Sequence, residues 1–365
     1  MIKKTFIVLM MAMLLFAAAC STKTSVSENP AEETVPSEEN TPGELEIIDS
    51  EENADDKTHE DKGKVVSPLD GLKYFPEQLK NRPVAVSIDN HPDARWQAGL
   101  SQAEIIYEFE VEYPYTRYLC IFHAQEPEMI GPVRSARPYI IYYAMENDGI
   151  FVHVGGSEDA FSEIDRLDCP DVDGLYSGAM WRYYDTGKKA PHNMYTTVKS
   201  IRDEAASYGY RKEGNFEGYL FNEKPHNISK DYKDSISAQN INITYNKSNT
   251  TSYEYDKELQ VYLRFKDGQK HVDELDKKQL STKNIIIIET KKSVLDNAGR
   301  LYIGTVGEGR GMYISNGEAV EITWSKSKEA SRTKFYSGND EIKLNPGNTW
   351  IQVVNYLDNV EIEKN

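Results

Sequence analysis

The chain has 365 residues, with 59 acidic and 42 basic side chains and a formal net charge of −17. This length allows two domains, and the acidic balance argues against a nucleic-acid partner, which would need a basic face. The hydrophobic fraction of 39% is low for a wholly globular chain, and a long polar segment near the N-terminus explains much of it.

The first 20 residues are typical of a bacterial export signal. Two lysines precede an apolar run, Thr5–Phe16, that is too short to cross a bilayer comfortably. Small residues, Ala17–Ala19, then lead to Cys20, an arrangement that resembles the lipobox of bacterial lipoproteins, although leucine is commoner at the position of Ala17. We predict lipidation of Cys20, whose two acyl chains would anchor the protein at the extracytoplasmic face of the cell membrane. The alternative is an ordinary signal peptide cleaved near Ala19.

Residues 21–66 are predicted to be a disordered acidic tether. Within residues 21–64 there are 14 Asp and Glu against 4 Lys, together with many Ser, Thr, Pro and Asn. Such a segment buries too little apolar surface to offset the entropy that ordering it would cost.

Residues 67–215 are predicted to form a first, mixed α/β domain. Alternation of apolar and polar residues predicts its strands, and apolar periodicity with capping residues predicts its helices. The predicted strands are 83–89, 104–112, 115–123 and 150–154, and the predicted helices are 138–147, 158–167 after Ser157 as the N-cap, and 193–208 with Asn193 as a possible N-cap. Residues 171–184 are predicted to be irregular.

Residues 216–239 lose periodicity and are predicted to connect to a β-rich domain, 240–365. The dipeptides Asp267-Gly268 and Asn316-Gly317 indicate hairpin turns. The predicted strands are 240–245, 260–265, 284–289, 300–306, 311–314, 319–324, 333–336 and 349–354. The predicted fold class is α+β, a layered sandwich of sheets and helices with a mixed α/β first lobe and a mostly antiparallel, β-rich second lobe.

Two cysteines remain after Cys20. Cys120 and Cys169 form no CxxC pair and no Cys/His zinc pattern. Outside the cell they could form one disulfide, and two buried free thiols are the alternative. We predict no metal site and no cofactor.

Two arginines stand in a Gly/Pro-bounded loop before a predicted helix. Arg134 and Arg137 suit forked contacts to carboxylate or phosphate, and the helix start at Pro138 also favours an anion. They could therefore form an anion subsite. Alternatively, they pair with the acidic strand that carries Glu108, Glu110 and Glu112.

Three further strand-end loops carry polar groups. Asp89, Asn90 and His91 follow the first strand and offer a general base or metal ligands, although such turns are common for local reasons. The stretch from His153 to Ser157 contains a glycine pair that lets a ligand approach the backbone, or simply makes a tight turn, and it matches no nucleotide-binding motif. The last of these loops brings His192 beside Asn193, and both could face the same cleft. Alternatively, His192 is a structural or exposed residue and Asn193 only caps the following helix.

The acidic strand offers one further chemistry. Its glutamates are spaced by two residues, about 7 Å apart along one face, which is compatible with two-carboxylate glycoside hydrolysis involving Glu110. A solvated strand face, or partners for the arginines, is the alternative.

Six stretches together carry a family resemblance: RPVAVSIDNHPDAR (82–95), GPVRSARPY (131–139), HVGGS (153–157), APHNMYTT (190–197), YISNGEAVEITWSK (313–326) and TKFYSGNDEIKLNPGNTWIQVV (333–354). Through them the chain resembles the YerB family of bacterial lipoproteins, which have paired N- and C-terminal domains of unknown function. The resemblance implies a membrane-anchored, extracytoplasmic protein of a Gram-positive type of organism, with a layered α+β fold and no established reaction.

Three functional hypotheses follow. The first is a lipoprotein that binds an anionic or carbohydrate-containing cell-envelope ligand, or acts as an envelope scaffold, through a cleft between the four loops. The second is a cell-wall polymer hydrolase or transferase that uses a carboxylate as acid or base. The third is an interaction module whose second lobe docks a membrane protein.

Overall fold

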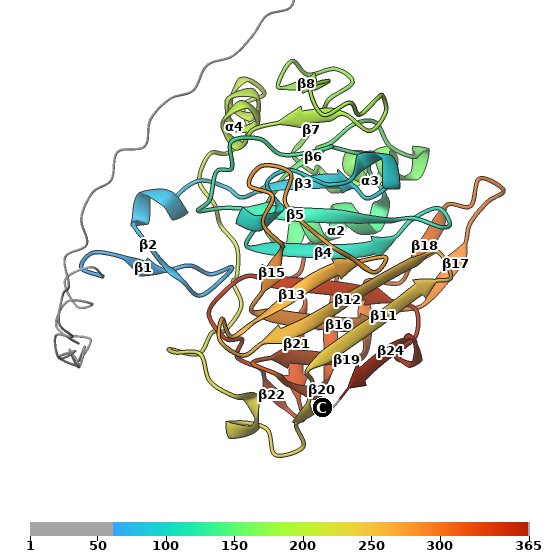
Figure 1. Cartoon of the computed structure of the whole chain (residues 1–365). Helices are drawn as coiled ribbons and strands as arrows, with labels where there is room; N and C mark the ends of the chain where they lie inside the picture. Colours follow the sequence, from blue (N-terminus) through green and yellow to red (C-terminus); the bar gives the residue numbers. More distant parts are fainter. Residues whose placement is uncertain (1–60, 364–365) are drawn as a thin grey trace, which may run out of the picture. The chain divides into compact units, whose positions relative to one another are not determined.

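The computed structural model describes residues 61–363 (Figure 1). The predictions for the signal, for Cys20 and for residues 21–60 lie outside this range. Residues 65–66 fell in the predicted tether, but β1 (Val65–Val66) pairs with β2 (Lys73–Tyr74), so the ordered chain begins slightly earlier than predicted. Within residues 61–363, no helix has the length and apolar character needed to cross a membrane.

One twelve-stranded sheet contains strands from both halves of the chain. Its order is β22 (Asp340–Glu341), β21 (Lys334–Ser337), β20 (Glu318–Lys326), β19 (Gly307–Ser315), β16 (Asn284–Glu289), β23 (Thr349–Val354), β4 (Ile105–Glu110), β5 (Thr116–Phe122), β3 (Val84–Asp89), β6 (Ile150–His153) and β7 (Asp171–Asp173), with β10 (Ile236–Ser237) on β20. Strand β23, near the end of the chain, pairs in parallel with β4 on one side and β16 on the other. This pairing places strands of both predicted domains in one sheet. The division into two domains stays a prediction.

A second, six-stranded sheet comes from the later half of the chain. It contains β14 (Gln269–Lys270), β13 (Val261–Lys266), β12 (Asn249–Asp256), β11 (Asn240–Asn246) and β24 (Val360–Glu363), with β15 (Ser281–Thr282) on β13. Two small ribbons complete the strands: β17 (Lys292–Val294) with β18 (Leu301–Ile303), and β8 (Met180–Arg182) with β9 (Met194–Thr196). The prediction of a β-rich chain with several sheets is therefore confirmed.

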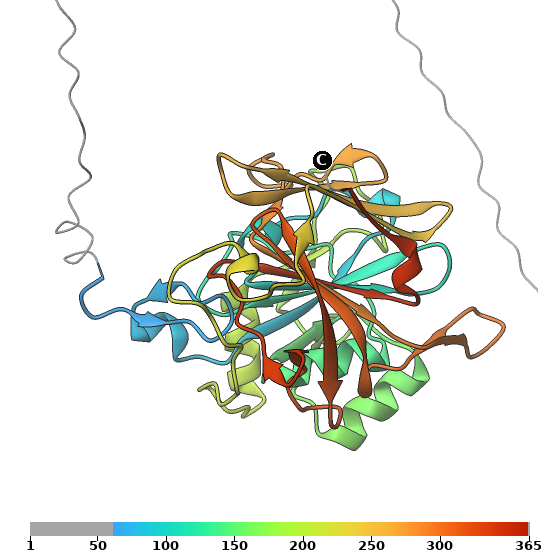
Figure 2. The ribbon, with the colours of Figure 1, turned by 90° about the horizontal axis from the view of Figure 1, so that it is seen from below.

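Helices α2 (Pro138–Glu146) and α3 (Glu158–Leu167) cover one face of the large sheet, and the second sheet together with α4 (Val198–Ser207) covers the other (Figure 2). The short 3-10 turns are η1 (Pro76–Leu79), η2 (Pro92–Ala94), η3 (Leu100–Gln102), η4 (Ile228–Lys230) and η5 (Leu357–Asn359). Alternate residues of β4 point to opposite faces. Tyr107 and Phe109 join an apolar cluster with α2 and α3, while Ile106 joins a cluster with α4 and β11–β13.

Several predicted elements are confirmed and some are wrong. Helix α3 begins after Ser157, whose side chain accepts a hydrogen bond from the Ala160 N–H, as predicted. Both dipeptide turns are present, with positive φ at each residue. The predicted helix 193–208 is wrong at its start, because residues 194–196 form β9 and Thr197, not Asn193, caps α4. Residues 171–184, predicted to be irregular, contain β7 and β8, and the sequence also missed β12 and β24.

The sequence left open whether Cys120 and Cys169 form a disulfide or are two buried free thiols. Cys120 and Cys169 are free thiols and both are buried. Burial raises the pKa of both thiols, to about 12 for Cys169, so neither has the character of a reactive thiolate.

A buried histidine directly after β5 makes stability depend on pH. Burial lowers the pKa of His123 to about 4, and its Nε2 lies 3.0 Å from the Leu79 carbonyl oxygen. The unfolded chain binds this proton with a pKa of about 6.5, so the stabilisation is complete above pH 6.5 and is lost as the pH falls toward 4. We expect His123→Gln to remove about 2–3 kcal/mol of the stability difference between pH 7 and pH 4.5, at about 1.4 kcal/mol per pKa unit.

Urea unfolding at both pH values would measure this difference. His226→Gln is the matched control, because His226 pairs with Asp231 in a partly exposed site. An unchanged difference in the His123→Gln variant would show that His123 does not titrate on unfolding.

Candidate functional site

The carboxyl ends of several strands meet at one edge of the large sheet. Strands β3, β6 and β7 are parallel, and β4 runs the same way because β5 is antiparallel to both β3 and β4. Their last residues include Asp89 and His153. In open α/β sheets, ligands bind outside this edge.

Side chains from three of the predicted loops meet there, and we call them the Asp89 cluster: Asp89, His91, Arg134 and His192. The His192 Nδ1 lies 2.7 Å from Asp89 Oδ2, and the Arg134 Nε lies 3.2 Å from the same oxygen. Asp89 Oδ1 accepts a hydrogen bond from the His91 backbone N–H at 3.0 Å. The predicted convergence therefore holds for these three loops.

The carboxylate at the centre of the cluster is ionised. Burial alone would raise the pKa of Asp89, but the hydrogen bond from His192 and the positive charges of Arg134 and Arg117 together hold it below its ordinary value. A buried carboxylate that contacts two side-chain donors fixes the position of each of them. Asp89 thus acts as the support on which Arg134 and His192 are oriented.

The hydrogen bonds set opposite tautomers in the two imidazole rings. His192 donates from Nδ1 to Asp89, which leaves a lone pair on its Nε2. The Nδ1 of His91 accepts a hydrogen bond from the Asp93 N–H at 3.1 Å, so its proton is on Nε2. The rings stack with centroids 4.4 Å apart and planes at 16°. The cluster therefore presents one donor and one acceptor from neighbouring rings.

The two arginines of the Gly/Pro-bounded loop have different partners. Arg137 pairs with Glu112, with its Nε 2.7 Å from Oε1, and so follows the alternative of pairing with the acidic strand. Arg134 approaches Asp89 through Nε, 3.2 Å from Oδ2, and among residues 61–363 its two terminal nitrogens make no hydrogen bond. Its side chain is 29% exposed, so Arg134 is the arginine free to bind an anion.

The fourth loop lies beside the cluster but uses its side chains internally. The Val154 N–H donates to the Arg134 carbonyl at 3.1 Å, and the Ala136 N–H donates to the Gly155 carbonyl at 2.8 Å. His153 is fully buried, with Nε2 2.9 Å from Asp171 Oδ2. The N-cap role of Ser157 likewise occupies its hydroxyl.

The remaining predicted residues are buried and bonded to protein. Asn90 donates to the Thr116 hydroxyl at 2.7 Å, and the Asn193 Oδ1 accepts from Arg182 at 3.1 Å. Glu110 pairs with Lys292 at 2.6 Å and lies two strands away from β3. The polar groups of these three side chains are therefore occupied by protein partners.

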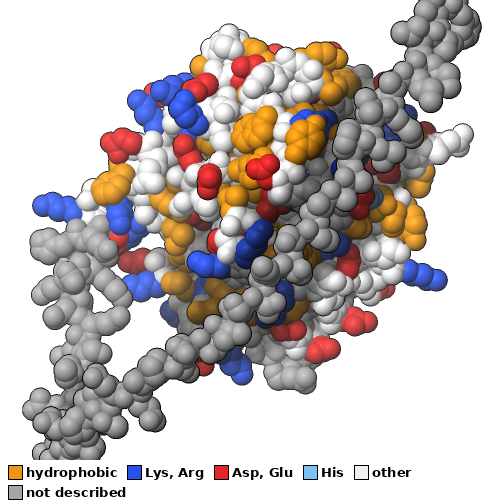
Figure 3. Space-filling view, turned by 45° about the horizontal axis from the view of Figure 1, so that its top comes forward, with side chains coloured by type: hydrophobic (Ala, Val, Ile, Leu, Met, Phe, Trp, Pro, Cys, Tyr) orange, Lys and Arg blue, Asp and Glu red, His pale blue; other side chains and the backbone are white. Residues whose placement is uncertain are grey.

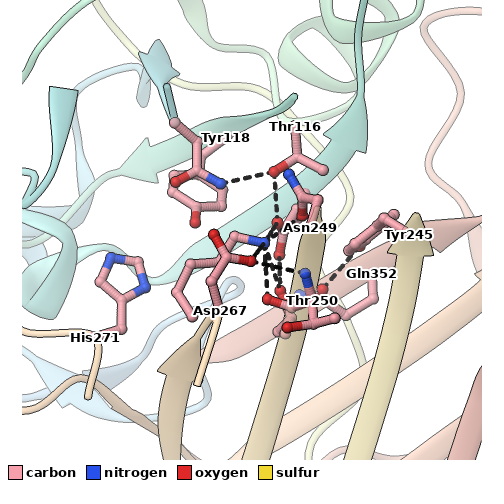
Figure 4. Close-up of polar contacts among 12 residues, drawn as sticks. Thr116, Tyr118, Tyr245, Asn249, Thr250, Asp267, His271 and Gln352 are labelled. Carbon is pink, nitrogen blue, oxygen red and sulfur yellow. Dashed lines mark hydrogen bonds and ion pairs between the residues drawn. The ribbon is translucent and has the colours of Figure 1, made fainter. Parts of the chain in front are cut away.

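A polar network links the cluster to the second sheet. The Gln97 side chain donates to the Asp89 carbonyl oxygen at 2.9 Å, and His271 lies 2.9 Å from the Gln97 Oε1. His271 in turn accepts from Arg264, which binds Glu108 inside the molecule. Figure 4 shows part of this network, in which side chains of β5 and the second sheet point toward one another.

Sequence reasoning missed two residues of the site. Asp93 is two residues after His91 and within reach of it, so its spacing was a usable signal. Arg117 stands opposite Asp89 in the β3–β5 register and donates to the Ser135 carbonyl at 2.7 Å. No local pattern specifies that register, so only the structure identifies Arg117.

Three side chains could hold a metal ion. One ligand atom from each of His91, Asp93 and His192 lies within 4.8 Å of the others. The prediction that no metal is bound stays a prediction.

Comparison with known proteins gives consistent matches. The family described as "Protein of unknown function (DUF3048) N-terminal domain" matches residues 69–211, and its C-terminal counterpart matches residues 241–351. "Putative lipoprotein YerB" of Bacillus subtilis (strain 168) is 34% identical over 305 residues, which cover 82% of this chain and 89% of that protein. The crystal structure of YerB protein from Bacillus subtilis has a TM-score of 0.74 and 34% identity, and the match covers 82% of this chain and 100% of that chain. The names of these relatives specify no ligand and no reaction.

Proposed function

We propose that this chain, which belongs to the YerB-like DUF3048 family, is a lipid-anchored extracytoplasmic protein whose Asp89 cluster binds an anionic group of a cell-envelope ligand. The observation that carries the proposal is the state of Arg134. Its Nε lies against Asp89, while its two terminal nitrogens make no hydrogen bond within residues 61–363. A guanidinium held in this way is prepared to bind a carboxylate or phosphate with two parallel hydrogen bonds.

The surroundings of Arg134 add to its suitability for an anion. His91 carries a second donor at Nε2, and Arg117 adds a buried positive charge beside Asp89. Burial lowers the pKa of Arg117 to about 10, so it keeps its charge at neutral pH. In this proposal, the predicted layered α+β arrangement is the rigid frame that holds the loops in place.

Exposed aromatic side chains support a carbohydrate-containing ligand. Tyr176, Trp181 and Tyr184 are exposed and belong to the same stretch of chain that delivers His192. Aromatic rings of this kind stack against sugar faces. On the face shown in Figure 3, basic and acidic side chains are interspersed with apolar ones. Individual side chains, rather than a large patch of one charge, would therefore select the ligand on this face.

The hydrolase hypothesis has less support from the geometry. It required Asp89 or Glu110 as a free acid or base at an open cleft. Both carboxylates are ion-paired, and their side chains are only 6% and 11% exposed. We therefore propose binding rather than carboxylate catalysis as the function of the site.

Replacing Arg134 tests the binding proposal. We expect Arg134→Gln to weaken binding of a glycerol-phosphate polymer about tenfold, because a hydrogen bond to a charged group contributes about 1.5–3 kcal/mol. Isothermal titration of the full-length protein in detergent would measure the affinity. An uncharged glycan of similar size is the reference ligand.

Arg166→Gln is the matched control. Arg166 is a half-exposed arginine on α3 that pairs with Glu163 and Glu329, away from the Asp89 cluster. Equal affinity of the wild type and Arg134→Gln for the polymer would refute the proposal.

A further inference from the structure

His91, Asp93 and His192 combine two nitrogen donors and one oxygen donor at one place on the surface. The first two come from the turn after β3, and His192 comes from the loop before β9. One ligand atom from each lies within 4.8 Å of the others. Two imidazoles and a carboxylate are a common donor set for Zn²⁺ and related transition metals.

The hydrogen bonds of His192 prepare it as a ligand. Its Nδ1 donates to Asp89, so its Nε2 keeps the lone pair that a metal needs. Metal-binding histidines commonly donate their other nitrogen to a carboxylate, which fixes the ring and raises its basicity. Asp89 has this position, and its bond to Arg134 holds it in place.

His91 and Asp93 are already close to the separation of two ligands on one ion. The His91 Nδ1 and the Asp93 Oδ2 lie 3.7 Å apart, whereas two ligands of a tetrahedral Zn²⁺ lie about 3.3 Å apart at bond lengths of about 2.0–2.1 Å. The lone pair of this Nδ1 now accepts the Asp93 N–H. An ion would take the place of that hydrogen, and the Nε2 proton of His91 would stay where it is.

The side chains have freedom to close around an ion. The stacked rings must turn apart, since a metal lies in the plane of each imidazole that binds it. The side chains of His91, His192 and Asp93 are 25%, 14% and 75% exposed, so this rotation can occur toward solvent.

We propose that His91, Asp93 and His192 bind one divalent transition-metal ion, for which Zn²⁺ is the best match, with Asp89 orienting His192. Three protein ligands leave a coordination position for water or for an oxygen of a bound molecule. The inference goes beyond the proposed function, because it needs no anionic ligand.

Equilibrium dialysis of the full-length protein in detergent against Zn²⁺, followed by elemental analysis, tests the proposal. The expected result is one Zn²⁺ per chain in the wild type. His192→Ala and Asp93→Asn are expected to weaken binding at least tenfold, and Asp89→Asn about 10- to 100-fold through the orientation of His192. Substitution with Co²⁺ should give the visible absorption of a four-coordinate nitrogen and oxygen site in the wild type and not in the His192→Ala or Asp93→Asn variant.

His226→Ala is the control, because His226 forms a similar histidine–carboxylate pair with Asp231 elsewhere on the surface. It is expected to keep one Zn²⁺ per chain. Thermal unfolding of each variant separates loss of the ion from loss of the fold, and His192→Gln provides a second variant of closer size. The proposal is overturned if the wild type binds no stoichiometric Zn²⁺, or if folded His192 variants bind it with wild-type affinity.

Discussion

Glu108→Ala is expected to lower the free energy of unfolding by about 3–5 kcal/mol, the effect of breaking a buried ion pair from one side. Glu108, Arg264 and Lys266 are all fully buried. Arg264 Nη2 lies 2.6 Å from Glu108 Oε2, and Lys266 Nζ lies 3.4 Å from Oε1. Alanine would leave two buried cations without their counter-ion between the two sheets.

The same carboxylate predicts how acid should affect the protein. Burial alone would raise the pKa of Glu108, but Lys266 and Arg264 hold it at about 2. The unfolded value is about 4.3, so the contribution to stability is complete above that pH and is lost as the pH falls toward 2. Glu108→Gln keeps the size of the side chain and should remove this part of the acid sensitivity.

Urea unfolding at pH 7 would measure the loss in the alanine variant. Arg166→Ala is the matched control, because its ion pairs are solvent-exposed and such pairs contribute about 0.2–1 kcal/mol. If Glu108→Ala is no less stable than the Arg166→Ala control, the buried pair does not hold the sheets together.

The strand that carries Arg264 shows why this ion pair could not be predicted from the sequence. Its residues alternate, but Tyr262, Arg264 and Lys266 are the buried ones, while Val261 and its alternate neighbours are only partly buried. Alternation alone assigns the charged face to solvent. The assignment reverses here because the facing strand β4 supplies Glu108, a partner about 150 residues away in the chain.

Elements defined by local signals were predicted well. Helix α3 follows a serine cap with acidic residues in its first turn, and both signals lie within a few residues. Strand β16 was predicted with its exact bounds, because four consecutive isoleucines have strong β preference. The start of α4 was wrong because Met194 fits the apolar period of the helix, yet its backbone pairs with Arg182 in the β8–β9 ribbon. Pairing with a distant segment overrode the local period.

The candidate site was predicted only in part, because pairing with distant segments also decides which of its side chains are free. The sequence indicates that polar strand-end loops gather at one edge, and Asp89, Arg134 and His192 do meet there. It does not indicate which side chains are already occupied. His153 is bound to Asp171 from the neighbouring strand β7, a pairing that depends on sheet order.

Separating the two predicted domains is expected to abolish folding of the first. A fragment of residues 61–239 lacks β23, so β4 would become an exposed edge in the middle of what is now one sheet. It also lacks β11–β13, which cover the face of the sheet that includes Ile106. Glu108, on the same face, would lose Arg264 and Lys266 together with the sheet that buries it. The fragment is expected to show neither a cooperative urea transition nor dispersed amide resonances.

Mixing this fragment with residues 240–365 should restore the cooperative transition and the dispersed resonances. The second fragment supplies β23 as the neighbour of β4, and it supplies Arg264 and Lys266 as partners of Glu108. The matched control is the folded full chain cut at a protease site inserted between Lys233 and Asp234, which are exposed. The cut chain should stay associated and unfold in one transition, since the parallel pairing of β23 with β4 does not depend on that peptide bond. A cooperative transition of residues 61–239 alone would instead mean that the first domain is stable with β4 as its edge. The sheet shared by the two halves would then be a docking contact between independent domains rather than a condition for folding.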